Sequence, residues 1–314
     1  MASPVPFTLE DTFQNPATGV VIYRIRVSDP ETSDCPTVRY LTAPSPPEGA
    51  SHTIPDHRGS NLAFDTVPAG DWNIGRLVVS SNDDATKGKF VLPSTEISAL
   101  DTSLGLLSAG PVWHDARFDL IHLLDAFYAQ RNRQLDDGSY IKSDQANVQC
   151  TGHVSALVLP SPFVRNSQGE QPQDKVVGIW AWQPGHAHGI ANESHIYSLL
   201  QQRQGNDNEE NNETPLAARF LGHITDNGTR VIGFLLEHIP GVRAADPEDI
   251  EACRDALGKL HKKGIALGGG LRRENFLVKP DGSVLLQGFG GAFETRKDEV
   301  FEEETEKFER EVLV

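Results

Sequence analysis

The spacing of apolar and polar residues changes near residue 145 and divides the chain into two kinds of pattern. Residues 1–145 are rich in Pro, Gly, Ser and Thr, and their apolar runs are short. The run V-V-I-Y-R-I-R-V from Val20 and the run R-L-V-V-S from Arg76 are rich in β-branched residues, which predicts strands. Between residues 118 and 130 apolar residues recur at helical spacing. We therefore expect a β-rich N-terminal extension with one helix.

Residues 146–314 carry longer periodic segments. Two strands are predicted, in C-T-G-H-V-S-A-L-V-L-P and in K-V-V-G-I-W-A-W. A helix containing N-E-S-H-I-Y-S-L-L-Q-Q follows, and then a strand in V-I-G-F-L-L-E-H-I. Between them, residues 201–216 hold almost no apolar side chains, which predicts a mobile loop.

The last third of the chain contains strong signals for helix ends and turns. Asp246 is an N-cap candidate followed by Pro247, and the helix that starts there should stop at Gly264. The segment N-F-L-V-K-P-D-G-S-V-L-L-Q predicts a hairpin whose turn is P-D-G at 280–282. The charged tail from Glu294 predicts a surface helix.

Charge and cysteine content narrow the classes of function. The chain has 28 Lys and Arg against 44 Asp and Glu, a net charge of −16. Nucleic acids and anionic membranes attract clustered positive charge, so we expect neither as a partner. We find neither an apolar run long enough to span a bilayer nor a signal peptide, and we expect a cytoplasmic protein. Cys35, Cys150 and Cys253 are far apart and odd in number, which favours reduced thiols.

The order of elements in residues 146–314 is that of a protein-kinase core. The stretch G-I-A-L-G-G-G-L-R-R-E-N-F-L-V-K-P-D-G-S-V-L-L-Q-G-F-G resembles the kinase catalytic loop, H-R-D-L-x-x-x-N, followed by D-F-G. Asn275 and Gly288 are thirteen residues apart, as the loop Asn and the D-F-G Asp are in kinases. The matching residues are Leu271, Asn275, Phe289 and Gly290.

Motifs nearer the N-terminus are similar to those of a fungal family of kinase-like proteins. They are P-A-G-D-W-N from Pro68, the pair Trp113 and His114, and N-E-S-H-I-Y around Glu193. Only 24 residues follow Gly290. The resemblance therefore implies an α+β, reduced protein-kinase-like fold, with a β-rich N-lobe and a short helical C-lobe behind the N-terminal extension.

Three charged groups of an active kinase are missing at the positions that the resemblance assigns to them. Ile179 takes the place of the Lys that binds the ATP phosphates, Gly270 that of the catalytic Asp, and Gly288 that of the D-F-G Asp. Phosphoryl transfer needs a phosphate clamp, a carboxylate at the attacking hydroxyl and a carboxylate for Mg²⁺. We expect no kinase activity, no metal and no cofactor.

The replacements remove charge from the expected cleft and favour an apolar small molecule. Glu193, at the position of the kinase αC Glu, has lost its Lys partner, so burial would raise its pKa. A neutral carboxyl group there could donate a hydrogen bond, or Arg272 could turn inward and pair with it. Glu193, Arg272 and Asn275 are therefore our candidate catalytic residues. The expected cleft residues are Ile179, Trp180, Trp182, Gly270, Gly288 and Phe289.

Two functions are compatible with this cleft. In the first, the protein is a cofactor-independent enzyme that cyclises or isomerises an apolar metabolite, for example in a pericyclic reaction of the Diels–Alder type. Such a reaction needs a substrate held near its reactive geometry and one or two hydrogen bonds to an activated carbonyl. The resemblance places it in fungal secondary metabolism. In the second, the protein is a non-catalytic pseudokinase that binds protein partners as a scaffold or regulator.

Several further residues are expected to be structural. His186 and His188 form no metal motif, because no Cys or carboxylate pattern accompanies them. Trp113 and His114 should anchor the N-terminal region on the core. Arg272 and Arg273 fit structural ion pairs as well as substrate binding, and Asn275 fits a role in holding its own loop now that no metal needs it.

Overall fold

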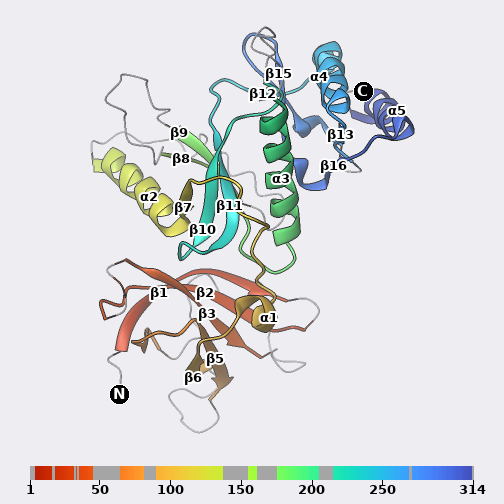
Figure 1. Ribbon diagram of the computed structural model, residues 1–314. Helices are drawn as coiled ribbons and strands as arrows, with labels where there is room; N and C mark the ends of the chain where they lie inside the picture. The colour runs from red at the N-terminus through yellow and green to blue at the C-terminus, as the bar shows by residue number, and fades with distance from the viewer. Residues whose placement is uncertain are drawn as a thin grey trace. The chain divides into compact units, whose positions relative to one another are not determined.

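The computed structural model describes residues 4–15, 18–31, 33, 35–44, 64–80, 90–136, 155–160, 175–204, 215–268 and 271–312. The chain combines sheets and helices and is an α+β protein (Figure 1). It forms two compact units, residues 1–107 and 108–314. Among the described helices none is both long and apolar enough to cross a membrane.

The first unit is built on a six-stranded sheet in the order β4-β1-β2-β3-β5-β6. Its strands are β1 (Pro4–Gln14), β2 (Val21–Val27), β3 (Thr37–Ala43), β4 (Thr66–Pro68), β5 (Ile74–Val79) and β6 (Phe90–Glu96). Strands β3 and β5 are parallel, and the other neighbours are antiparallel. The short helix α1 (Leu100–Leu104) follows the sheet. Buried apolar side chains such as Tyr23, Ile25 and Leu41 form the core of the first unit.

The P-A-G-D-W-N motif is a turn closed by an aromatic side chain. The indole N–H of Trp72 donates to the carbonyl of Pro68 at 2.8 Å, and the guanidinium of Arg39 lies 4.6 Å from the Trp72 ring. Gly70 adopts a φ of +106°, and its N–H donates to Asp29 Oδ2 at 2.9 Å. The motif therefore stabilises its own unit.

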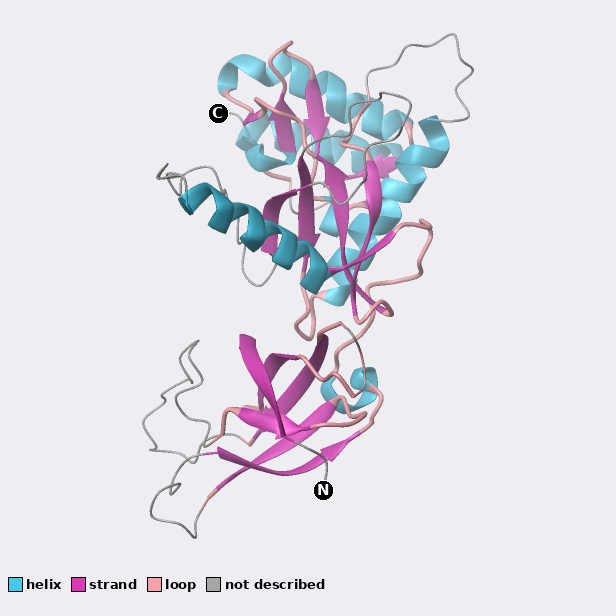
Figure 2. Cartoon of the chain, turned by 90° about the vertical axis from the view of Figure 1, so that its left-hand side faces the viewer, coloured by secondary structure: helices cyan, strands magenta, loops and turns pink. Residues whose placement is uncertain are grey.

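The second unit contains a five-stranded sheet in the order β7-β10-β11-β9-β8. Its strands are β7 (Arg117–Asp119), β8 (Ser155–Pro160), β9 (Lys175–Trp180), β10 (Phe220–Asp226) and β11 (Arg230–Glu237). Helix α2 (Leu120–Asp136) covers one face, where Leu120 and Leu123 join the apolar cluster of the strands. Helix α3 (Ala187–Gln204) covers the other face, where Tyr197 packs against Phe220 and Phe234 (Figures 1 and 2).

The division between the units differs from the boundary expected near residue 145. Strand β7 pairs in parallel with β10, Arg117 lying opposite His223, so β7 and α2 belong to the second unit. This pairing joins residues about one hundred positions apart and leaves no local pattern in the sequence. Most of the predicted mobile loop, residues 205–214, lies outside the described residues, and its start belongs to α3.

The helical part of the second unit follows the sheet. It contains helix α4 (Ile250–Lys262), introduced by the turn η2 (Pro247–Asp249), and helix α5 (Asp298–Lys307), continued by η5 (Phe308–Val312). The turns η3 (Arg273–Asn275) and η4 (Phe289–Gly291) carry the loop residues of interest. The short strands are β12 (Arg243–Ala244), β13 (Ile265–Ala266), β14 (Phe276–Val278), β15 (Val284–Leu286) and β16 (Phe293–Glu294).

Three local predictions are confirmed in this part. The N–H of Asp246 donates to Asp249 Oδ2 at 2.7 Å in a capping box, and Pro247 opens the helical segment. The segment ends at Gly264, whose φ is +71°. The hairpin β14–β15 turns at the predicted P-D-G, where the N–H of Gly282 donates to the carbonyl of Lys279 at 2.9 Å.

Candidate functional site

A cavity of about 440 Å³ lies in the second unit, next to the predicted site. Its walls come from strands β8 and β9, from helix α3, from the segment after β11 and from the hairpin β14–β15. This volume is within the range of pockets that bind small molecules, and most of the side chains around it are apolar. The apolar side chains include Leu157, Val177, Ile179, Leu236, Leu277 and Leu286.

Strand β9 places Ile179 in the cavity wall, as the sequence predicts, but it does not place Trp180 there. Alternate residues of a strand point to opposite faces of the sheet. Val177 and Ile179 line the cavity, whereas Trp180 packs with the cluster under α2. The prediction that Trp180 is a cleft residue is therefore corrected by the register of the strand.

Trp182 and Phe289 are also core residues that do not line the cavity. Trp182 is buried, and its carbonyl accepts a hydrogen bond from Arg230 Nη2 at 2.5 Å. Phe289 is fully buried and meets the ring of Tyr197 edge to face, with centroids 5.2 Å apart. Both side chains stabilise the unit by packing. Gly270 was also predicted to line the cleft, but it lies outside the described residues.

The side chain of Asn275 holds its own loop together, which is the structural of the two roles expected for it, the other being catalytic. Its Oδ1 accepts from the N–H of Arg272 at 2.7 Å, and its Nδ2 donates to the carbonyl of Gln287 at 2.8 Å. Gly288 comes next, with a φ of +74°, and a Cβ built on it would lie 2.7 Å from Asn275 Nδ2. The side chain of Asn275 thus occupies the space that a side chain at position 288 would need.

Glu193 lies on α3 facing the turn η4. Burial raises its pKa to about 7, while hydrogen bonds with the backbone of Phe289 and Gly288 act in the opposite direction. The expected direction of this shift is confirmed. The side chain of Arg272 is exposed, and among the described residues it forms no ion pair with Glu193. Neither Glu193, Arg272 nor Asn275 lines the cavity.

Glu304 of α5, which the sequence analysis did not single out, holds the start of the catalytic-loop stretch. Its carboxylate accepts from the N–H of Leu267 at 3.1 Å and from the N–H of Gly268 at 2.7 Å. His261 Nε2 lies 2.7 Å from Glu304 Oε2. Phe301, Glu304 and Phe308 are spaced to share one helix face, and this periodicity is the signal that could have found Glu304 within the acidic tail.

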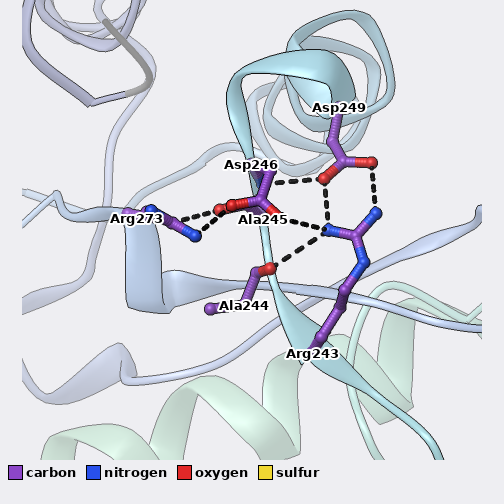
Figure 3. Close-up of polar contacts among 6 residues, drawn as sticks. All are labelled: Arg243, Ala244, Ala245, Asp246, Asp249 and Arg273. Atoms are coloured by element: carbon purple, nitrogen blue, oxygen red, sulfur yellow. Dashed lines mark hydrogen bonds and ion pairs between the residues drawn. The ribbon is translucent and has the colours of Figure 1, made fainter.

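The guanidinium groups of Arg243 and Arg273 are each paired with an acidic side chain (Figure 3). Arg243, a lining residue, donates to both carboxylate oxygens of Asp249 at 2.6 and 2.9 Å. Arg273 donates to the carbonyl of Ala245 and to Asp246 Oδ1. Because carboxylates already neutralise these guanidinium groups, neither offers an unpaired positive charge to a phosphate. Arg273 has the structural role that the sequence analysis considered.

The other predicted structural residues lie within the second unit. The ring of Trp113 packs on the ring of Phe220, with their centroids 4.3 Å apart, and its indole N–H donates to Ser194 Oγ at 2.9 Å. The backbone N–H groups of Trp113 and His114 are directed to His223 Nε2, at 3.3 and 3.4 Å. Within the described ranges, no group of three or more His, Cys, Asp and Glu side chains could hold a metal ion.

Comparison of the chain with protein-family models and with curated proteins finds no match.

Proposed function

We propose that the cavity of the second unit binds an apolar small molecule and that the protein does not transfer phosphate. The observation that carries this proposal is the cavity of about 440 Å³, whose walls are formed largely by side chains such as Ile179, Leu236 and Leu277. Burial of apolar surface in such a site provides the affinity, since each Å² removed from water contributes roughly 25 cal/mol. A triphosphate with Mg²⁺ lacks such complementarity.

The unit that holds the cavity is, in this proposal, a reduced protein-kinase-like fold. Support comes from the order of β8, β9, α3, β11, α4 and the hairpin β14–β15, which is the order on which the resemblance rests; the structure adds the strand β10 between α3 and β11. Further support comes from Glu193, which lies on α3 beside the G-F-G turn. In this frame Ile179 occupies the position of the phosphate-binding Lys.

Two features support the loss of phosphoryl transfer. The Nδ2 of Asn275 donates to Gln287 within its own loop, and Gly288 offers no carboxylate. Arg243, a cation at the cavity, is bound by Asp249. Phosphoryl transfer depends almost entirely on positioned charge and metal, so a site with these features has no means of stabilising its transition state.

The reaction class that suits this site is a cofactor-independent cyclisation or isomerisation, of the kind expected in fungal secondary metabolism. An apolar cavity can hold a flexible substrate in a folded, near-reactive conformation, and this positioning lowers the barrier without a metal or a strong acid. The residues expected to be catalytic, Glu193, Arg272 and Asn275, do not line the cavity. Catalysis in this proposal therefore depends on the walls of the cavity.

Thermal shift with two ligands tests the proposal. A ligand that binds only the folded state raises the unfolding midpoint. We expect 2-acetylnaphthalene, a compact apolar ketone, to raise the midpoint and Mg-ATP to leave it unchanged. Ala218→Phe places a bulky ring at a lining position and should abolish the shift, whereas Ala129→Phe on the exposed part of α2 should retain it. A shift with Mg-ATP alone would contradict the proposal.

A non-catalytic scaffold is the second candidate, and one observation in the first unit favours it. The side chains of Val78, Val79 and Ile97 are 45%, 47% and 69% exposed at or near strands β5 and β6. Large apolar side chains that are exposed to solvent are one feature of surfaces that contact other proteins. The absence of a thermal shift with both ligands would favour this function over the small-molecule site.

A further inference from the structure

A single ring nitrogen of His223, on strand β10, holds two backbone groups of a distant part of the chain. The N–H groups of Trp113 and His114 lie 3.3 and 3.4 Å from His223 Nε2. The backbone N–H of His223 in turn donates to the carbonyl of Ala116 at 2.9 Å. His223 is fully buried. These contacts fasten residues 113–116, which lead into β7 and which we call the entry segment, to strand β10.

The two N–H donors fix the protonation state of the His223 ring. A nitrogen that accepts a hydrogen bond must keep its lone pair, so Nε2 is unprotonated and the proton of the neutral ring lies on Nδ1. Nδ1 is buried and has no hydrogen-bond partner within the described part of the chain. A proton added to Nε2 would remove both hydrogen bonds and would direct a third N–H at the two donors. The contacts between the ring and the entry segment therefore require the neutral form of His223.

The surroundings of the ring oppose a positive charge on it. Burial lowers the pKa of His223 to about 4, and the charges of His114 and Arg117 act in the same direction. Arg117 lies opposite His223 in the parallel pair β7–β10, and Phe234 lies opposite it on β11. The acidic residue of the entry segment, Asp115, is exposed. The ring is thus flanked by cationic and apolar groups.

The entry segment also contacts helix α3. The indole N–H of Trp113 donates to Ser194 Oγ at 2.9 Å, and the Trp113 ring packs on Phe220 beside His223. Ser194 carries no charge, so this contact brings no countercharge from α3 to the ring of His223. Release of the entry segment would therefore remove a hydrogen bond of α3 as well as the contacts with β10.

We propose that His223 is an acid-sensitive latch, whose neutral ring holds residues 113–116 on β10 and whose protonation releases them. This inference goes beyond the proposed function and does not depend on a ligand in the cavity. In the released state the ring takes up a proton near its ordinary pKa of 6.5, whereas the latched ring does so near 4. The stability that the latch contributes is therefore full above pH 6.5 and is lost as the pH falls towards 4.

Hydrogen exchange of the full chain, measured for separate peptides and divided by the intrinsic exchange rate at each pH, tests the latch. The opening constant of residues 113–116 should rise about twentyfold between pH 7 and pH 5, as the two pKa values of His223 require. The amides of α4 should show no such rise. In His223→Gln, whose amide oxygen accepts an N–H but does not titrate, the rise should be absent. His188→Gln, which removes an exposed histidine of α3, is the control and should retain it.

Nitrogen NMR of the unmodified chain, labelled with 15N-histidine, tests the latch without any substitution. At pH 7 the signal of His223, identified by the contacts of its ring with the Trp113 ring, should show a proton on Nδ1 and none on Nε2. A proton on Nε2 at this pH would overturn the inference. An equal rise in exchange for residues 113–116 and for α4 would also overturn it, because acid would then unfold the unit as a whole. A rise that persists in His223→Gln would assign the effect to another group.

Discussion

Replacing Gly288 by alanine tests whether the loop from Asn275 to Gly288 is closed by the contacts described above. Gly288 has a φ of +74°, and an added Cβ would lie 2.7 Å from Asn275 Nδ2. Gly282, in the hairpin turn, has a φ of +82° but no heavy atom within 4 Å of its added Cβ. The two positions share the unfavourable backbone conformation and differ in the contact, so their comparison isolates the contact.

The expected magnitudes follow from these geometries. An alanine in the left-handed region destabilises the folded state by about 1 kcal/mol, and this is the whole effect expected for Gly282→Ala. At position 288 the side chain of Asn275 must also move. Its hydrogen bonds with Gln287 and Arg272 are then weakened or lost, at about 1 kcal/mol each. Gly288→Ala should therefore lower the free energy of unfolding by about 2–3 kcal/mol.

Urea unfolding followed by tryptophan fluorescence measures this difference. The chain has four tryptophans, and Trp72 is the one in the first unit. A Trp72→Phe background therefore restricts the signal to the second unit, which contains Trp113, Trp180 and Trp182. Equal losses for Gly288→Ala and Gly282→Ala would show that Asn275 moves freely, and the description of a closed loop would be wrong.

Three further predictions concern buried charge. Glu304→Gln should lower the free energy of unfolding by about 2 kcal/mol, because a charged acceptor for two backbone N–H groups is lost. Urea unfolding measures this loss, and Glu303→Gln, at an exposed position, should have little effect in the same assay. The pKa of Glu193 is raised from 4.5 to about 7, so the folded state binds this proton more tightly. The stabilisation that this bound proton provides is full below pH 4.5 and is lost as the pH rises through 7, by about 3 kcal/mol at most. The stability of Glu193→Gln relative to the unmodified chain should therefore rise between pH 5 and 8. Parallel curves of stability against pH for the two proteins would refute this. Ile179→Lys should abolish binding of 2-acetylnaphthalene in a fluorescence titration without producing a thermal shift with Mg-ATP, because Gly288 still offers no carboxylate to Mg²⁺.

Local chemistry made much of the second unit predictable. Asp246 and Pro247 mark a helix start, and P-D-G marks a turn, because each residue type restricts the backbone by itself. Strand β7 was not predicted. Its three residues form a strand by pairing with β10, more than one hundred positions later, and such pairing depends on the whole unit. The same long-range pairing moved the division between the units from about residue 145 to Leu107.

The candidate site was predictable where it depends on spacing along the chain. Counting from Asn275 identified Gly288, and the structure places the two side by side. The wall of the cavity depends on side-chain direction, so one position of register on β9 separates Ile179, which lines it, from Trp180, which does not. Tyr197 of α3 also lines the cavity and was missed, because an aromatic residue within a helix indicates core packing.

The polar groups of the predicted site are already paired within the protein, which bears on how the proposed ligand would be held. Asn275, Glu193 and Arg243 each have partners from the protein itself, so a ligand that used them would first have to break those contacts. Apolar side chains of the cavity wall, such as Ile179, Leu236 and Leu277, have no such contacts to lose. In the proposed function the affinity for the ligand therefore comes from burial of apolar surface, at roughly 25 cal/mol for each Å² removed from water.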